Sequence, residues 1–341
     1  MIKHAFWNNK GGTGKTSLIF QCLIAIARDN PEKRFLALDL CPQANFSELL
    51  LGGLVGAGAD HLRRHQNELP ARTVGGYFEH RLPSPFSAPR NLDPTRFLTR
   101  PCETNPKMPP NIDLLCGDPL LELQSTAISS LANTNIPGHN SWMSVIDWLT
   151  DFLNDLEERY ELGFIDCNPS FSMYTQIALS CCDRLVLPVM ADDSSRRALE
   201  NAFSLVYGFS LPSDIYEKHN FATRLKDAGR PLPKVHLILK NRLTQYMGPA
   251  SAYAAVLNSI DLMLASLLRQ HPSHFTFQQP AEASVDIRDF GTTGVVAFAQ
   301  GHDFGTLKSG QHRIGNQEIQ VRGDYVEHCL EAIRNVTTRL L

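Results

Sequence analysis

Short apolar runs alternate along the chain with longer segments in which apolar residues recur every three or four positions. This alternation is typical of a parallel sheet that helices cover on both faces. We therefore expect an α/β fold with a mostly parallel, doubly wound sheet flanked by helices. The apolar runs predict strands near residues 2–7, 34–39, 112–116, 163–166, 184–189, 235–239 and 295–298. The helical pattern predicts helices near residues 15–28, 142–159, 194–208, 250–269 and 323–340, with Asp324 as the cap of the last.

Two stretches depart from this rhythm. Residues 52–110 are rich in Gly, Pro and Arg and show only patchy periodicity, which predicts an insertion or a flap over the edge of the sheet. Residues 209–233 are predicted to form a second, turn-rich loop. The sequence shows no internal repeat, so we expect a single domain over residues 1–341 that carries these two segments.

Composition narrows the range of partners and locations. The formal net charge of −3 provides no general attraction to nucleic acid or to an acidic membrane, so a partner of that kind needs a local basic patch. The eight cysteines are scattered without a CxxC pair, which favours reduced thiols. No charged leader opens the sequence, and no apolar window approaches the roughly 20 residues that span a bilayer. We expect a soluble cytoplasmic protein without a membrane partner.

Residues 9–16 carry the first chemical signal, because they nearly fit the phosphate-loop pattern G-x-x-x-x-G-K-[ST], with Asn9 where the first glycine belongs. A strand is expected before them and a helix after them. Such a loop turns its backbone N–H groups towards phosphate oxygens, and glycines permit the close approach and the unusual dihedral angles. The glycines available for this are Gly11, Gly12 and Gly14.

The side chains of this loop predict ATP with magnesium as the ligand. Lys15 is expected to neutralise the β- and γ-phosphates, and the hydroxyl of Thr16 to coordinate magnesium. Lys10, at the start of the loop, is an additional lysine that need not face the nucleotide of its own subunit. The expected nucleotide-binding residues of the loop are Lys10, Gly11, Gly12, Thr13, Gly14, Lys15, Thr16 and Ser17.

The segment Asn8–Thr16 resembles the deviant Walker A motif of the ParA/MinD family of partition and positioning ATPases. Residues 35–45 (FLALDLCPQAN) resemble the second motif of that family, an apolar strand that ends in D-x-D-P-Q-x-N. Residues 160–170 resemble its Walker B strand, and residues 178–191 are similar to the helix end and strand that follow. Residues 239–242 match the place where an Asn often reads adenine. The resemblance covers most of the chain and favours the ParA-like partition ATPases.

This resemblance implies a P-loop ATPase fold of the deviant Walker A type. It makes Lys10 the signature lysine, which reaches across an ATP-sandwich homodimer to the phosphates of the partner subunit. It also implies that Asp39 and Asp166 hold magnesium through waters. The residues implied at the nucleotide are Lys10, Lys15 and Asp39 for catalysis, Thr16, Asp39 and Asp166 for magnesium, and Asn241 and Arg242 for the base.

Cys41 departs from the family pattern, because it stands at the second aspartate of D-x-D-P-Q, which is credited with orienting the attacking water. A thiol has an ordinary pKa of about 8.5 and accepts hydrogen bonds poorly, so it is a weak substitute for a carboxylate. We therefore expect slow or partner-stimulated hydrolysis. Structural alternatives stay open: a buried thiol for Cys41, a turn aspartate for Asp166 and a loop residue for Asn241.

Three functions are compatible with these expectations. A ParA-like ATPase for DNA partition or cargo positioning would bind DNA non-specifically as an ATP dimer, at the nucleoid, and an adaptor protein would stimulate its hydrolysis. A nucleotide-dependent regulatory or scaffold protein would instead display residues 52–110 to protein partners. A membrane-positioning ATPase similar to MinD is disfavoured, because no basic amphipathic tail is expected after the last helix. The basic residues available to DNA, or simply to solvent, are Arg224, Lys226, Arg230, Lys234, Lys240, Arg242, Lys308, Arg313 and Arg322.

Overall fold

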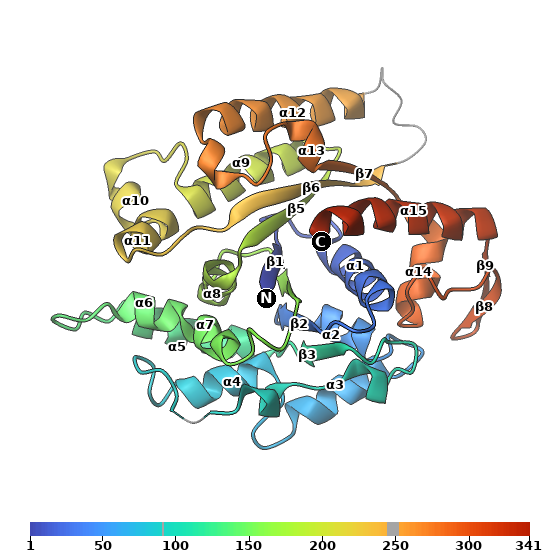
Figure 1. Ribbon diagram of the computed structural model, residues 1–341, viewed down its shortest axis with the longest axis horizontal. Coiled ribbons are helices and arrows are strands. Elements are labelled where there is room, and N and C mark those ends of the chain that lie inside the picture. Colours follow the sequence, from blue (N-terminus) through green and yellow to red (C-terminus); the bar gives the residue numbers. More distant parts are fainter. Residues whose placement is uncertain (91, 244–251) are drawn as a thin grey trace.

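A sheet of parallel strands forms the centre of the molecule (Figure 1). The computed structural model describes residues 1–90, 92–243 and 252–341. Within these residues the sheet has seven strands in the order β3-β2-β4-β1-β5-β6-β7, and each neighbouring pair is parallel, so the predicted fold class is confirmed. The strands are β1 (Ile2–Phe6), β2 (Phe35–Leu40), β3 (Ile112–Leu115), β4 (Leu162–Cys167), β5 (Arg184–Met190), β6 (Lys234–Leu243) and β7 (Ser284–Arg288).

Helices cover both faces of the sheet, because successive side chains of each strand point into two different apolar cores. Phe6 belongs to one core, whereas Ala5 and Trp7 belong to the other. The first core takes buried side chains from α1 (Lys15–Asp29), α2 (Asn45–Leu50), α3 (Gly58–Gln66), α14 (Gly291–Ala299) and α15 (Gly323–Leu340). The second takes them from α4 (Val74–Arg81), α5 (Leu120–Ala132), α6 (Ser141–Ile146), α7 (Trp148–Asn154), α8 (Met173–Cys181), α9 (Asp193–Tyr207), α11 (Phe221–Asp227) and α12 (Ala252–Gln270).

Smaller elements complete the chain. They are α10 (Asp214–His219), α13 (Pro280–Ala283), an antiparallel hairpin of β8 (Gly310–Ile314) and β9 (Gln317–Val321), and three 3-10 turns at Pro94–Phe97, Pro101–Glu103 and Pro272–His274. Across the described residues, every helix falls short of the length and apolar content that crossing a membrane requires.

The strand predicted at residues 295–298 was wrong, because these residues lie inside helix α14. The run is short and apolar, and its period alone does not distinguish a strand from a buried helix segment. The seventh strand is β7, at the edge of the sheet, where Val285 and Ile287 are the buried positions of an alternating pattern. A strand with so little apolar content leaves a weak signal in the sequence.

Two helix predictions also need correction. Residues 142–159 hold two helices, α6 and α7, that meet at Asp147. Asp324 is not the cap of α15, because the helix begins at Gly323 and Asp324 lies in its first turn, in an ion pair with Arg322. The other predicted strands and helices are confirmed to within a few residues, except that residues 250 and 251 lie outside the described residues.

Residues 52–110 are built into the molecule and are not a loose flap over the edge of the sheet. Thr99 forms an antiparallel bridge with Leu114 of β3, which extends the edge of the sheet. Arg81 on α4 is 2% exposed and forms a 2.7 Å ion pair with Asp151 on α7. The aromatic side chains of this segment, Tyr77, Phe78 and Phe97, are fully buried in the same core as α7. Residues 209–233 likewise contain α10 and α11.

Candidate functional site

The loop between β1 and α1 has the backbone that its glycines predict. It follows the carboxyl end of β1, and both Gly12 (φ +74°) and Gly14 (φ +87°) have the left-handed conformation that glycine adopts without strain. Gly14 is required for a second reason, because a Cβ atom there would lie 2.1 Å from Nδ2 of Asn241. The loop and the end of β6 are therefore in direct contact.

Lys15 is poised to neutralise an anion in this loop. Its side chain is buried, and Nζ donates a 3.4 Å hydrogen bond to the carbonyl of Lys10. Burial lowers the pKa of Lys15, and the nearby charge of Asp166 opposes that effect. A buried ammonium that donates its hydrogen bond to a neutral carbonyl gains most from a ligand that carries negative charge.

Asp39 and Asp166 lie side by side below the loop, because they are register partners on β2 and β4. Both carboxylates are buried. Burial is the main cause that raises the pKa of Asp39 to about 6, against hydrogen bonds from Ser47 and Cys41. Burial and the charge of Asp39 raise the pKa of Asp166 to about 7, against the effects of Thr16 and Lys15. Two buried carboxylates with raised pKa values would be stabilised in the charged form by a nearby cation.

Thr16 and Asp166 fit the expected magnesium site. The Thr16 hydroxyl donates a 2.7 Å hydrogen bond to Oδ2 of Asp166, whereas Oδ1 of Asp166 is buried and has no hydrogen-bond partner among the described residues. An unpartnered buried carboxylate oxygen of this kind suits a hydrated divalent cation. Within the described part of the chain, no group of three His, Cys, Asp or Glu side chains could hold a metal ion by itself.

Asp39 also holds the chain that follows β2. Oδ1 accepts from the backbone N–H of Cys41 (3.1 Å), and Oδ2 accepts from the backbone N–H (2.9 Å) and the hydroxyl (2.8 Å) of Ser47. The Ser47 hydroxyl in turn accepts from the N–H of Gly117. Asp39 therefore fixes the turn between β2 and α2. The sequence did not single out Ser47, although a serine in the first turn of a helix after this motif was a usable signal.

Lys10 contacts its own subunit in the single chain. Its Nζ lies 2.6 and 2.7 Å from the two carboxylate oxygens of Asp192 and 3.1 Å from the hydroxyl of Ser195. Burial works to raise the pKa of Asp192, but hydrogen bonds from Lys10, Ser194 and Ser195 hold it at about 2. Asp192 also caps α9 by accepting from the N–H of Ser195. The sequence did not reveal this contact, because 182 positions separate Lys10 from Asp192.

Cys41 follows β2 close to both carboxylates. Burial, followed by the charges of Asp39 and Asp166, raises the pKa of the Cys41 thiol to about 12. The thiol is therefore uncharged at neutral pH and provides no anionic acceptor beside the loop.

A cavity of about 350 Å³ opens beside the phosphate loop. Its lining includes Gly14 and Ser17 of the loop and the two residues expected at the base, Asn241 and Arg242. Nδ2 of Asn241 donates a 2.9 Å hydrogen bond to the carbonyl of Thr13, which ties the end of β6 to the loop. The other lining residues, which the sequence did not single out, are Asp289, Phe290, Gly291, Gly294, Val295 and Phe298. They come from α14 and from the two residues before it, and part of this helix was predicted as a strand.

Several of the basic residues considered for DNA are engaged within the chain. Lys240 is buried in a 2.8 Å ion pair with Asp261, and Arg230 is paired with Asp147. Arg224 stacks over the ring of Trp142 at 4.3 Å. Arg322 is paired with Asp324. The exposed members of the set include Lys226, Lys234, Lys308 and Arg313.

Comparison with known proteins shows what this geometry is similar to. No model of a known protein family matches the sequence, and no curated protein matches it. An ATP complex of an McdA variant from Cyanothece is 14% identical with a TM-score of 0.64, covering 100% of this chain and 96% of that one. A putative plasmid partition protein from Borrelia burgdorferi B31, bound to AMPPNP, is 13% identical with a TM-score of 0.55, covering 100% and 99%. Cobyrinic acid a,c-diamide synthase from Mycobacterium smegmatis, with an ATP analogue and magnesium, is 16% identical with a TM-score of 0.51, covering 76% and 81%.

These similarities establish the fold. The chain has the fold of the ParA-like P-loop ATPases, as the resemblance of its motifs implies. The alignments with the first two structures cover 100% of this chain.

Proposed function

We propose that this chain is a ParA-like ATPase that binds Mg-ATP in the loop of residues 10–17 and forms a dimer across the nucleotide. The arrangement of Lys15, Thr16 and Asp166 supports the proposal most directly. It places a buried ammonium, a hydroxyl and an unpartnered carboxylate oxygen around the loop. The solved structures with the same fold include proteins bound to ATP or its analogues.

Different residues of the site would bind different parts of the nucleotide. The backbone N–H groups of the loop would bind the phosphates, with Lys15 neutralising their charge. Thr16 and Asp166 would hold magnesium, with Asp39 near them, and the ion would supply further charge neutralisation at the phosphate oxygens. The cavity beside Asn241 and Arg242 would take the base.

Lys10 would serve the partner subunit. In the dimer that we propose, its ammonium leaves Asp192 and Ser195 and contacts the phosphates bound by the other chain. The exchange replaces one charge-assisted interaction with another, so its free-energy cost is small compared with that of breaking an ion pair outright. ATP carries the γ-phosphate that Lys10 would contact, so ATP would favour the dimer more strongly than ADP does.

Hydrolysis in this dimer would be slow or dependent on a partner. The uncharged Cys41 thiol does not orient water as a carboxylate would, while Lys10, Lys15 and the bound ion still stabilise the phosphoryl group. The cellular role that we propose is DNA partition or cargo positioning in the cytoplasm. It would use non-specific DNA binding at the nucleoid and an adaptor that stimulates hydrolysis.

A second candidate is a nucleotide-dependent regulatory or scaffold protein that acts through protein partners. The internal pairing of Lys240, Arg230 and Arg322 favours it, because these residues are less available to DNA. A gel-shift assay at increasing salt separates the two roles. ATP-dependent DNA binding that falls steeply with salt supports partition, whereas its absence together with ATP-dependent capture of a protein supports the scaffold.

Light scattering after size exclusion tests the ATP dimer. We expect wild-type protein to dimerise with Mg-ATP and to remain monomeric with Mg-ADP. Lys10→Ala should retain ATP binding and remain monomeric, whereas Lys15→Ala should lose ATP binding. Lys33→Ala is the matched control, because this lysine pairs with Glu161 at the opposite end of the sheet. Dimerisation of Lys10→Ala at the wild-type ATP concentration would contradict the proposed role of Lys10.

A further inference from the structure

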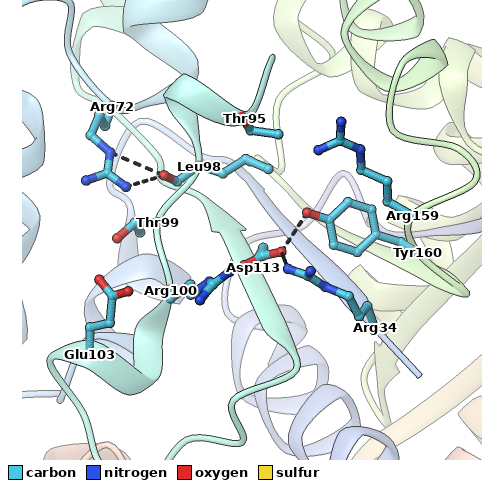
Figure 2. A pocket seen from close by; sticks show the side chains of 10 residues that line it. All are labelled: Arg34, Arg72, Thr95, Leu98, Thr99, Arg100, Glu103, Asp113, Arg159 and Tyr160. Carbon is cyan, nitrogen blue, oxygen red and sulfur yellow. Dashed lines mark hydrogen bonds and ion pairs between the residues drawn. The ribbon is translucent and has the colours of Figure 1, made fainter. Parts of the chain in front are cut away.

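A second cavity lies at the end of the sheet opposite the phosphate loop (Figure 2). It has a volume of about 320 Å³ and receives side chains from the amino ends of β2, β3 and β4 and from the segment 72–103. We call it the arginine cavity. Its lining residues are Arg34, Arg72, Thr95, Leu98, Thr99, Arg100, Glu103, Asp113, Arg159 and Tyr160.

The arginine cavity has an excess of positive charge. Four guanidinium groups line it, against the carboxylates of two lining residues, Glu103 and Asp113, and a third carboxylate, that of Glu68, lies 3.8 Å from Arg72 just outside the lining. The four arginines come from three separate parts of the chain, so the fold brings them together and no single basic run does. They are Arg34, Arg72, Arg100 and Arg159.

Asp113 organises one side of the cavity. Its carboxylate is 7% exposed, pairs closely with Arg34 and lies 3.6 Å from Nε of Arg100. The hydroxyl of Tyr160 donates a 2.6 Å hydrogen bond to the same carboxylate. Burial and the neighbouring Asp113 raise the pKa of Tyr160, so the hydroxyl remains a donor. One buried carboxylate thus fixes two guanidinium groups in place.

The charges of the other two arginines, Arg72 and Arg159, are less neutralised by neighbouring carboxylates. Arg72 donates through its guanidinium to the carbonyl of Leu98, and its nearest carboxylate, Glu68, is 3.8 Å away. Arg159 forms no ion pair within 4.0 Å among residues 1–90, 92–243 and 252–341, although its charge is one of the lesser causes that lower the pKa of Asp93. Figure 2 shows Arg72 and Arg159 on opposite sides of the view, with Asp113 between them. Both cations remain available to a ligand.

We propose that the arginine cavity binds a small molecule that carries a phosphate group. A phosphate monoester has a charge close to −2 at neutral pH, and a lining with more guanidinium groups than carboxylates favours such an anion over one with a single charge. Guanidinium groups donate two parallel hydrogen bonds to phosphate oxygens and are suited to this ligand. The volume falls in the range of small-molecule sites. This inference does not depend on the proposed ATPase function.

Calorimetric titration with pyrophosphate tests the proposal. The full-length chain is used with Lys15→Ala, which silences phosphate binding at the loop. We expect binding that the double substitution Arg100→Gln and Arg159→Gln weakens about tenfold or more, because each lost guanidinium removes charge-assisted hydrogen bonds. The matched control is Arg63→Gln on α3, an exposed arginine outside the cavity, which should leave binding unchanged.

Further measurements identify the ligand and test whether the variants are correctly folded. Inorganic phosphate should compete with pyrophosphate, and citrate should compete less well. Arg159→Gln alone, at a position without an ion pair to lose, should already weaken binding while circular dichroism stays unchanged. The proposal is overturned by no binding in the Lys15→Ala chain, by binding indifferent to Arg100 and Arg159, or by arginine-dependent binding of an oligonucleotide but not of pyrophosphate.

Discussion

Cys41 is the residue at which the site differs most in its chemistry from the motif it resembles. Its thiol is uncharged, and the two neighbouring carboxylates help to keep it so. In the function that we propose, the residue would therefore determine how well a water molecule is oriented, rather than whether a nucleotide binds. A substitution that restores the carboxylate isolates this effect.

We predict that Cys41→Asp raises the rate of ATP hydrolysis about tenfold or more, because a carboxylate can orient the attacking water. The same substitution places a third carboxylate beside Asp39 and Asp166, so the free energy of unfolding should fall by about 1–3 kcal/mol. Single-turnover phosphate release and urea denaturation measure the two effects. Cys41→Ala is the control and should hydrolyse ATP as slowly as wild type. If Cys41→Ala abolished measurable turnover without weakening ATP binding, the thiol would itself be catalytic.

The backbone of the loop was predictable from sequence, because the spacing of its glycines defines it, and the same spacing singled out Lys15 and Thr16. The partners of Lys10 and Asp39 were not. Asp192 and Ser47 reach them through the fold, and neither carries a mark in its own sequence surroundings that points to the loop. Short-range patterns reveal the groups that contact a ligand more readily than the groups that hold them.

At the scale of elements, α14 connects two regions of the molecule. Its residues line the cavity beside the phosphate loop, and its carboxyl end packs against the beginning of segment 52–110. Gly53 has a φ of +61°, and a Cβ atom there would lie 2.4 Å from the carbonyl oxygen of Phe298 and 2.7 Å from the N–H of Gly301. The close approach of these backbones leaves no room for a side chain.

We predict that Gly53→Ala lowers the free energy of unfolding by about 2 kcal/mol or more, because it adds a backbone clash to the cost of a positive φ. Gly229→Ala is the matched control. Gly229 has a φ of +68° but open space around its Cβ position, so only the conformational cost of about 1 kcal/mol should appear. Urea denaturation measures both. Equal losses in the two variants would show that the contact with α14 contributes nothing.

The same element explains why part of the site was missed in the sequence. An apolar run of four residues has no period to measure, and the parallel sheet made a strand the expected reading of Val295–Phe298. The error removed Asp289 and Phe290 from consideration, because they then lay before a strand rather than at the start of a helix that borders the loop. Asn241 and Arg242 were found by resemblance, whereas their neighbours across the cavity needed the fold.

For the whole molecule, the central strand β1 contains a titratable group that affects stability. His4 is fully buried, its two ring nitrogens have no hydrogen-bond partner in the described structure, and its ring lies 5.5 Å from that of His236. Burial, followed by the charges of His236 and Arg184, holds the pKa of His4 well below its ordinary value. The folded protein therefore contains the neutral imidazole.

We predict that the free energy of unfolding decreases as the pH falls below about 6.5. The unfolded chain then binds a proton at His4 that the folded chain does not, which favours unfolding by up to about 1.4 kcal/mol per pH unit. His4→Phe should remove this part of the slope between pH 7 and pH 5. His328→Phe, an exposed position on α15, is the control and should retain the slope. Urea denaturation at several pH values measures the difference from wild type. The same slope in His4→Phe as in wild type would rule out this linkage.

β2 and β4 connect the two sites that we propose. They are adjacent from the pair Phe35 and Leu162 to the pair Leu40 and Cys167, with the arginine cavity at their amino ends and Asp39 and Asp166 near their carboxyl ends. Six residues span about 20 Å, so occupants of the two sites cannot touch. Thermodynamic linkage nevertheless makes them reciprocal: the factor by which a phosphate compound changes the affinity for ATP is the factor by which ATP changes the affinity for that compound. Measuring each affinity with the other site empty and with it occupied would show whether β2 and β4 couple binding at the two sites.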